Sequence, residues 1–268
     1  MTVIDGSAAS GLNLAEYWQY RTLFIFLTTR DIKLRYRQTW RGVAWALVQP
    51  LLPMLIFAAI FARVLRPELP YGPYWLYVLA GLAPWNFFAN AVNYASLTFV
   101  GNFNLLNKVY FPRAVLPFAA VSACLIDILV SGSVLIGVSW WQGYPPSWRL
   151  FLIPLVMLAG YAAAIAVGLA AASLTVLYRD LKPLISFLVQ VWMYATPVLY
   201  PLTMIPGRWR WLAWLNPMTG VVEAFRHCLF GAAVDWIGAA LSLLAIALVG
   251  IAAVLVYGRL EADLAERV

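Results

Sequence analysis

Apolar residues in this chain are gathered into long runs that charged residues rarely interrupt. A transmembrane helix needs roughly 20 consecutive apolar residues to cross about 30 Å of hydrocarbon. The runs without any charge are Gly42–Ala62, Leu69–Asn107, Leu150–Tyr178, Pro183–Gly207 and Trp236–Gly258. The run Ala114–Trp141 is broken by Asp127 alone, and the asparagine-rich end of Leu69–Asn107 predicts a loop. The pattern therefore predicts an all-α integral membrane protein, a single domain over residues 1–268, with six transmembrane helices.

Composition supports this fold class and excludes a soluble globular protein. The chain is 64% hydrophobic and 11% charged, with a mean hydropathy of +0.82. Soluble domains are only about 45–50% apolar and about 25% charged. The polar stretch Met1–Gly11 does not resemble a signal peptide. Cys124 and Cys228 lie in different kinds of segment, which argues against a disulfide framework, and without Cys/His metal spacing we expect no bound metal.

The basic residues set the expected orientation, because lysine and arginine stay on the cytoplasmic side of short loops. With six spans both termini share one side. That side would hold Arg21, Arg30, Lys33, Arg35, Arg37, Arg41, Lys108, Arg113, Arg179, Lys182, Arg259 and Arg267. The other side would hold Arg63, Arg66, Arg149, Arg208, Arg210 and Arg226. We therefore expect both termini in the cytoplasm. This bias and contact with anionic lipids explain the net charge of +7 without nucleic acid.

The N-terminal segment 13–41 is apolar in part but too interrupted by charge to span a membrane. Arg30, Lys33, Arg37 and Arg41 recur at helical spacing on one face, and Asp31 can pair with Arg35 at i, i+4. Apolar side chains beside a basic stripe are typical of a helix that lies in the membrane interface. The helix would either anchor to lipid or also contact a partner protein.

The segment 101–113 follows the second predicted span and combines asparagines with apolar side chains. The apolar residues are Leu105, Leu106, Val109, Tyr110 and Phe111, with Lys108 among them and Pro112 at the end. The segment is able to form a short amphipathic helix whose apolar face needs a partner. Both a partner protein and the lipid surface fit this pattern.

Between the fifth and sixth predicted spans, segment 202–231 holds two apolar pieces, 209–215 and 217–230. Each piece is too short to span, so together they predict a re-entrant pair on the outer side. Asn216 followed by Pro217 is a favourable N-cap and first helical position. Glu223 and His227 are i, i+4 neighbours, for which a structural pair and substrate contact both stay open.

Asp127 lies near the middle of the third predicted span, where a carboxylate is costly unless it is paired or functional. A hydrogen bond or interface pair, the lining of a polar conduit and proton coupling are the alternatives. The short turn Tyr178–Pro183 is expected on the cytoplasmic side. Aromatic rings that an interfacial belt does not explain are candidates to pack on sugar rings: Phe57, Phe61, Trp85, Phe88, Trp192 and Tyr194.

Several of these segments, taken in order, resemble the type-2 ABC exporter permeases that export polysaccharide, such as O-antigen, capsule or teichoic acid chains. The similar stretches are 30–39, 42–45, 49–51, 104–113, 178–180, 196–198 and 215–217. The resemblance covers essentially the whole chain and implies an inner-membrane homodimer. It also implies a separate nucleotide-binding ATPase, which carries ATP and magnesium, and a substrate linked to an undecaprenyl-type lipid.

The resemblance also implies roles for particular residues. The interface helix and the segment after span two would dock on the ATPase through Arg30, Lys33, Arg37, Leu105, Leu106, Lys108, Tyr110 and Phe111. The outer re-entrant helices would cap the channel exit through Trp209, Trp211, Trp214, Asn216 and Glu223. Independently of the resemblance, the chain lacks a Gly-x-x-x-x-Gly-Lys-Ser/Thr phosphate loop, so we expect no ATP hydrolysis and no bound cofactor of its own.

Other function classes have weaker support in the sequence. A lipid-linked glycosyl or acyl transferase needs acids, histidines or metal ligands clustered at the interface, whereas this chain has one histidine and an isolated Asp127. A proton-coupled secondary transporter is expected to show an inverted repeat and coupled carboxylates. Exporters of other substrates, such as teichoic acid or a drug or lipid, remain alternatives to polysaccharide export.

Overall fold

The computed structural model of the protein describes residues 18–36, 56, 72–109, 111–178 and 180–267, and these residues form helices and no strand. The helices are α2 (Arg21–Tyr36), α4 (Tyr74–Ala95), α5 (Thr98–Gly101), α6 (Phe103–Lys108), α7 (Val115–Ala123), α8 (Leu125–Trp141), α9 (Ile153–Leu177), α10 (Leu181–Ala195), α11 (Arg210–Trp214), α12 (Pro217–Phe230) and α13 (Trp236–Arg267). Short 3-10 helices cover Trp148–Leu152, Leu202–Met204 and Gly207–Trp209. The predicted all-helical integral membrane class is confirmed.

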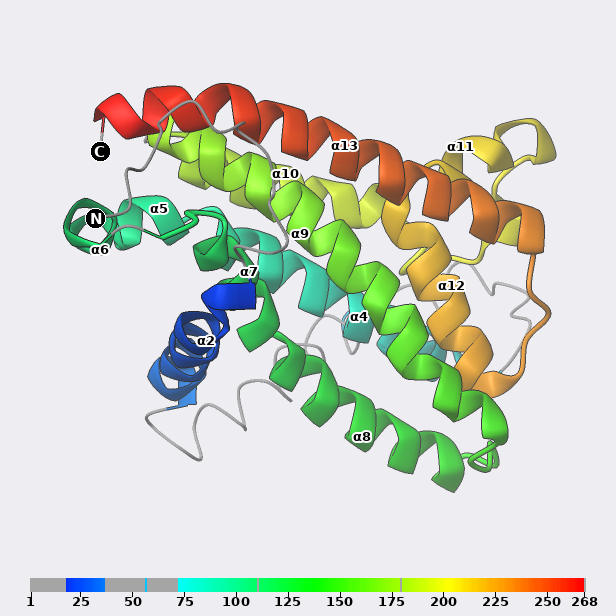
Figure 1. The fold of residues 1–268 in the computed structure, drawn as a ribbon. Helices are drawn as coiled ribbons and strands as arrows, with labels where there is room; N and C mark the ends of the chain where they lie inside the picture. The colour runs from blue at the N-terminus through cyan, green and yellow to red at the C-terminus, as the bar shows by residue number, and fades with distance from the viewer. Residues whose placement is uncertain (1–17, 37–55, 57–71, 110, 179, 268) are drawn as a thin grey trace.

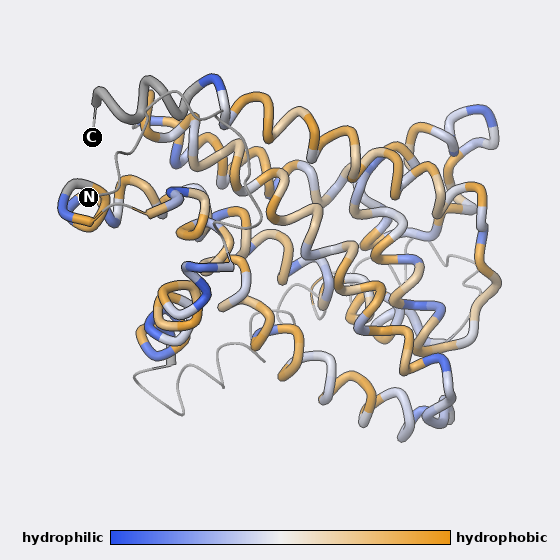
Figure 2. Tube along the Cα trace, in the orientation of Figure 1, coloured by the Kyte–Doolittle hydropathy of each residue, from blue (hydrophilic) through white to orange (hydrophobic). Residues whose placement is uncertain are grey.

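Three described helical segments are long and apolar enough to cross a membrane. They are Val115–Trp141, formed by α7 and α8, then Trp148–Leu177 and Trp236–Arg259. They coincide with the predicted third, fourth and sixth spans. Apolar residues follow α8, α9 and α13 for most of their length, whereas hydrophilic residues are frequent on α2, occur within α12 and mark several loops (Figure 2). The predicted first span, 42–62, lies outside the described residues.

Helix α4 is the centre of the larger hydrophobic core. Its 22 residues include 16 that are buried, and it packs against α7, α8, α9, α10 and α12. The helix continues through Pro84 in its interior. The first half of α4 carries apolar side chains on nearly every face. This suits its position, because the neighbouring helices cover most of its circumference.

Helix α10 is shorter than the uncharged run 183–207 that predicted the fifth span. It ends at Ala195 after 15 residues, a length of about 22 Å. Thr196 takes an extended conformation (φ −96°, ψ 138°), as expected for the residue before a proline, here Pro197. The chain then continues through buried Val198 and Leu199 into segment 202–231, which we call the outer segment after its predicted side. The fifth hydrophobic run is therefore a short helix followed by an irregular buried segment.

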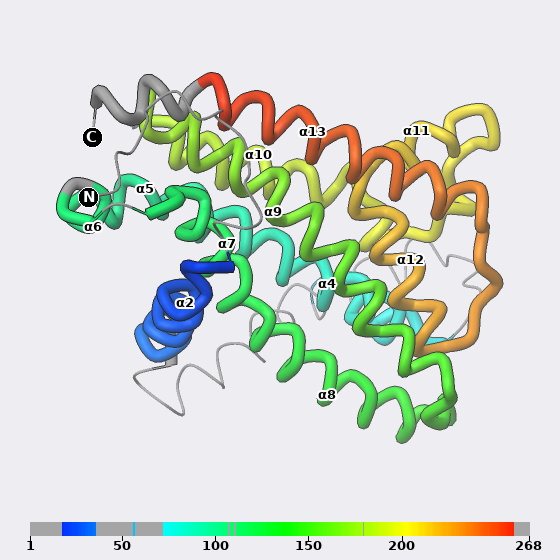
Figure 3. The backbone as a smooth tube through the Cα atoms, in the orientation of Figure 1, coloured from blue at the N-terminus to red at the C-terminus, as the bar shows by residue number. Residues whose placement is uncertain are grey.

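A second, smaller core lies at one end of the bundle. Leu27 of α2 packs there with Phe99, Phe111 and Leu116, and α2 itself rests on α7. In Figures 1 and 3, α5, α6 and the C-terminal part of α13 lie at this same end, whereas α11 and the start of α13 lie at the opposite end. The segments predicted to share the cytoplasmic side thus share one end of the molecule.

Candidate functional site

The junction between α2 and the third span contains a partly buried ion pair. Arg35 Nη1 lies 3.0 Å from Asp127 Oδ2 and its Nη2 donates to Cys124 Sγ at 2.9 Å. The guanidinium also lies over the Tyr94 ring, 3.7 Å from its centroid. Of the three alternatives left open for Asp127, an ion pair is the one that the structure shows. The predicted Asp31–Arg35 pair is wrong, because Arg35 turns toward the span and Asp31 binds Arg30 instead, at 2.9 Å.

The local chain geometry favours this ion pair. The segment 115–141 is interrupted at Cys124, so Asp127 falls in the first turn of α8, where the helix dipole stabilises a negative charge. Burial by itself lowers the pKa of Arg35, but the facing Cys124 and Asp127 outweigh it, so the pKa of Arg35 is raised above its ordinary value. The guanidinium consequently stays charged, and the pair connects the interface helix to a membrane span.

A second contact connects α2 to the segment predicted to couple to an ATPase. Arg30 Nη1 donates to Asn102 Oδ1 at 3.0 Å, and Asn102 in turn donates to the Thr98 carbonyl at 2.8 Å. Asn102 lies between α5 and α6, so Arg30 holds the turn that orients α6. Lys33 is exposed, and Arg37 lies outside the described residues.

The predicted short helix in 101–113 is α6, but its apolar side chains point in two directions. Leu105 and Leu106 pack against the smaller core, and Phe111 is buried within it at 4% exposure. Among the side chains of this segment that the structure describes, Phe103, Asn104, Lys108 and Val109 are exposed. Phe111 thus anchors the segment to its own chain, and its side chain is not available to a partner. Tyr110 lies outside the described residues, and the docking role stays a prediction.

The outer segment is organised around Asn216, whose predicted capping role is confirmed. Its Oδ1 accepts from the Met218 amide and from Trp192 Nε1, both at 3.1 Å, and its Nδ2 donates to Thr196 Oγ1 at 2.8 Å. Asn216 therefore caps α12 and also ties α12 to the end of α10. This explains why the short α10 and the outer segment form one unit.

The three candidate tryptophans of the outer gate have different environments. Trp214 is buried and lies against Gly238 of α13, where a side chain would have no room. Ser242 of α13 donates to the Trp214 carbonyl at 2.7 Å. Trp209 and Trp211 are half exposed. The segment is thus fastened to α13 at Trp214, while the other two rings remain on the surface.

Arg226 of α12 is completely buried. Its guanidinium donates to the Tyr77 hydroxyl (2.7 Å), the Pro197 carbonyl (2.8 Å) and the Val198 carbonyl (2.6 Å), and it pairs with Glu223 at 2.8 Å. Glu223 therefore pairs with Arg226 and not with its i, i+4 neighbour. His227 instead contacts the Ala232 carbonyl.

These contacts join α4, α12 and the loop after α10 in one network. Gly81 of α4 makes room for it, since a Cβ there would lie 2.4 Å from a guanidinium nitrogen. Sequence reasoning missed this role of Arg226. The signals that were present are an arginine in an apolar helix and an unexplained glycine in α4.

The structure brings three of the glycan-path candidates together. Phe88 lies 5.4 Å from Trp85 and 5.3 Å from Trp192 between ring centroids. Trp85 and Phe88 are buried in the core of the chain, whereas Tyr194 is about half exposed. Phe57 and Phe61 lie outside the described residues. Contact of any of these rings with a glycan stays a prediction.

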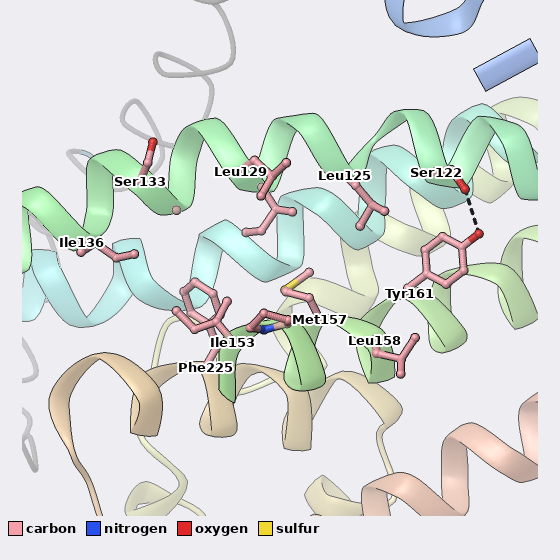
Figure 4. Close-up of a pocket in the computed structure, with 13 residues that line it drawn as sticks. Ser122, Leu125, Leu129, Ser133, Ile136, Ile153, Met157, Leu158, Tyr161 and Phe225 are labelled. Carbon is pink, nitrogen blue, oxygen red and sulfur yellow. Dashed lines mark hydrogen bonds between the residues drawn. The ribbon is translucent and has the colours of Figure 1, made fainter. Parts of the chain in front are cut away.

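An apolar cavity of about 610 Å³ lies between α8 and α9 and reaches Phe225 of α12 (Figure 4). Its walls are aliphatic for the most part, and Ser122 and Tyr161 form a hydrogen bond of 2.8 Å at one end. No carboxylate, histidine or cysteine lines it. Within the described ranges, no three His, Cys, Asp or Glu residues are grouped as metal ligands. These surroundings suit hydrocarbon and offer no acid–base chemistry.

Comparison with known proteins agrees with a transport subunit. The ABC-2 type transporter family matches residues 22–230, so the chain belongs to the ABC-2 type transporter family. Members of this family are transport subunits, and their ATPase is a separate subunit. This chain is therefore a transport subunit and not itself an enzyme.

Individual relatives cover most of the chain. The O-antigen export system permease protein RfbA of Myxococcus xanthus is 35% identical over 214 residues, 79% of this chain and 81% of that protein. RfbA of Klebsiella pneumoniae is 30% identical over 207 residues, 76% and 79% of the two chains. The polysialic acid transport protein KpsM of Escherichia coli is 25% identical over 208 residues, 75% and 78%.

Proposed function

We propose that this chain is the membrane subunit of an ATP-driven exporter that moves an O-antigen-like polysaccharide, linked to an undecaprenyl-type lipid, across the cytoplasmic membrane. The observation that carries the proposal is the 35% identity to an O-antigen export permease over about four fifths of both chains. The described residues hold no group of three His, Cys, Asp or Glu side chains that could hold a metal ion, which supports transport over transferase chemistry, since that chemistry needs clustered acids or metal ligands.

In this proposal the chain crosses the membrane six times and has both termini in the cytoplasm. The basic-residue count supports this orientation, as does the grouping of α2, α5 and α6 at one end of the bundle. Impermeant thiol labelling tests it with single cysteines placed at Gly207 and at Asn104. We expect labelling of intact cells at position 207 only. Labelling of position 104 from outside would show that the orientation is reversed.

The partner ATPase would dock on the surface formed by α2 and α6, and two copies of the chain would enclose the conduit. Arg30 supports this site because its bond to Asn102 makes α2 and α6 one surface. The exposed apolar side chains of Phe103 in α6 and of Val109 directly after it supply area for a partner to bury. A pore wide enough for a polymer needs more wall than one chain supplies, which favours a homodimer.

The deciding experiment is reconstitution with and without a nucleotide-binding subunit. We expect no ATP hydrolysis by the purified chain, and hydrolysis coupled to glycan export when both subunits are present. Export of the lipid-linked glycan in cells that lack their own permease gives the functional readout. Robust hydrolysis by this chain alone, or normal glycan export without it, would contradict the proposal.

A further inference from the structure

Helix α4 carries three asparagines on one face of its second half. Asn86, Asn90 and Asn93 follow each other at spacings of four and three residues, so their side chains project from the same side of the helix. They rise about 10 Å along its axis. Most other positions in this half are buried apolar residues, whereas the three asparagines are each only partly buried in the part of the chain that the structure describes.

The facing helix α10 continues this polar surface. Ser186 donates to Asn93 Oδ1 at 2.8 Å, and α10 packs against α4. Gln190 lies one turn after Ser186 on the same side of α10 and is exposed. Two packed helices, which correspond to the predicted second and fifth spans, therefore present hydrogen-bonding side chains along their line of contact. We call this surface the amide lane, with the members Asn86, Asn90, Asn93, Ser186 and Gln190.

The amides retain unused hydrogen-bonding capacity. Asn86 Nδ2 is buried and Asn90 is half buried, and neither has a hydrogen-bond partner among the residues that the structure describes. Asn93 uses one Nδ2 proton on the Ala89 carbonyl and keeps the other. Unpaired amides are costly in hydrocarbon, where no water replaces a missing partner. A row of them is stable only when water, a polar ligand or the polar side chains of another helix meet it.

We propose that the amide lane is a wall of the export path, along which the hydroxyl groups of a glycan form successive hydrogen bonds. An amide both donates and accepts, and a sugar hydroxyl does the same, so each matches the other in any orientation. A series of closely spaced hydrogen bonds binds the glycan along the path without fixing it at one position. The glycan identity rests on the proposed function, whereas the polar character of the lane rests on the geometry of α4 and α10.

Leucine substitutions test the lane because leucine resembles asparagine in size and lacks its polar groups. In the complex with the ATPase, Asn90→Leu and Asn93→Leu should each lower glycan export roughly threefold to tenfold, the change expected for one lost hydrogen bond. Dimer formation, ATPase binding and ATP hydrolysis should be kept. Asn90→Gln keeps the amide and should retain export. Ser133→Leu is the matched control, since Ser133 is exposed on α8 and bonds its own helix at the Val130 carbonyl.

A second measurement does not depend on the substrate. Cysteine replaces Asn90 in one variant and the exposed Leu248 near the middle of α13 in another, in a chain whose buried Cys124 and Cys228 are changed to alanine. A charged thiol reagent should modify the cysteine at position 90 in the assembled complex. It should leave the cysteine at position 248 unmodified, because hydrocarbon surrounds that side chain.

The outcomes separate the competing explanations. If Asn90→Leu and Asn93→Leu dissociate the dimer, the amides join helices between chains and the inference is wrong. Unchanged export by both variants, or an unreactive cysteine at position 90, also overturns it. If the wild-type complex exports no glycan while position 90 reacts, the proposed function and the glycan assignment both fail, and the polar conduit stands.

Discussion

Replacement of Arg226 by methionine tests whether one buried arginine holds the outer segment on the bundle. The wild-type side chain is fully buried and makes charge-assisted bonds to Tyr77, to the Pro197 and Val198 carbonyls and to Glu223. Methionine replaces the aliphatic stem of arginine but not its guanidinium. The loss arises because the space of the guanidinium is left empty and buried oxygen atoms keep their places without a donor.

The expected loss of stability comes from Glu223 and the carbonyl groups, which remain without their donor. Removal of one partner from a buried ion pair costs about 3–5 kcal/mol, because the other charge stays uncompensated. Each buried carbonyl that loses its donor costs about 1–3 kcal/mol. This cost is not added to the cost of the broken ion pair, because the two describe partly the same loss. We therefore expect Arg226→Met to lower the free energy of unfolding by about 3–5 kcal/mol. At about 2–4 °C per kcal/mol for a chain of this size, Tm falls by roughly 6–20 °C.

The measurement is thermal unfolding of the purified chain in detergent, followed by the loss of monodisperse protein on heating. Arg208→Met is the matched control, because Arg208 is exposed. Its guanidinium carbon lies 5.7 Å from the centroid of the Trp209 ring, a weak surface contact. We expect little change in Tm for this control. If Arg226→Met lowers Tm no more than Arg208→Met does, the network around Arg226 does not hold the outer segment.

Three further predictions follow from the other contacts. Phe103→Asp combined with Val109→Asp should abolish co-purification of the ATPase while the chain still inserts, because burial of each side chain contributes about 1.5–3 kcal/mol; full assembly would show that α6 is not the docking surface. Arg35→Asp and Asp127→Arg should each lower Tm, and the double variant should recover part of the loss; a double variant worse than both would refute a direct pair. Gly81→Ala should lower Tm by an amount equivalent to about 1–3 kcal/mol, because its Cβ would lie 2.4 Å from a guanidinium nitrogen; an unchanged Tm would show that the network moves freely.

The amino-acid sequence by itself determined the features that depend on length and local pattern. Runs of more than 20 uncharged residues predicted membrane helices, since a backbone in hydrocarbon must satisfy its own hydrogen bonds. The predicted third, fourth and sixth spans appear at 115–141, 148–177 and 236–259. Asn216 and Pro217 predicted the start of α12 for a similar reason, because capping involves neighbours in the chain. The early end of α10 at Ala195 also had a local signal in Pro197, although hydrophobicity alone extended the predicted span past it.

Tertiary structure decided which distant residues meet. Arg35 and Asp127 are 92 positions apart, and local spacing in the sequence indicated Asp31 as the partner of Arg35 instead. Whether Leu105 points toward a partner or its own core depends on where α2 and α7 lie, as does the burial of Phe111. Periodicity identifies the faces of a helix, but the free energy of burial depends on what covers each face. That covering is supplied by helices far away in the sequence, so only the folded chain decides it.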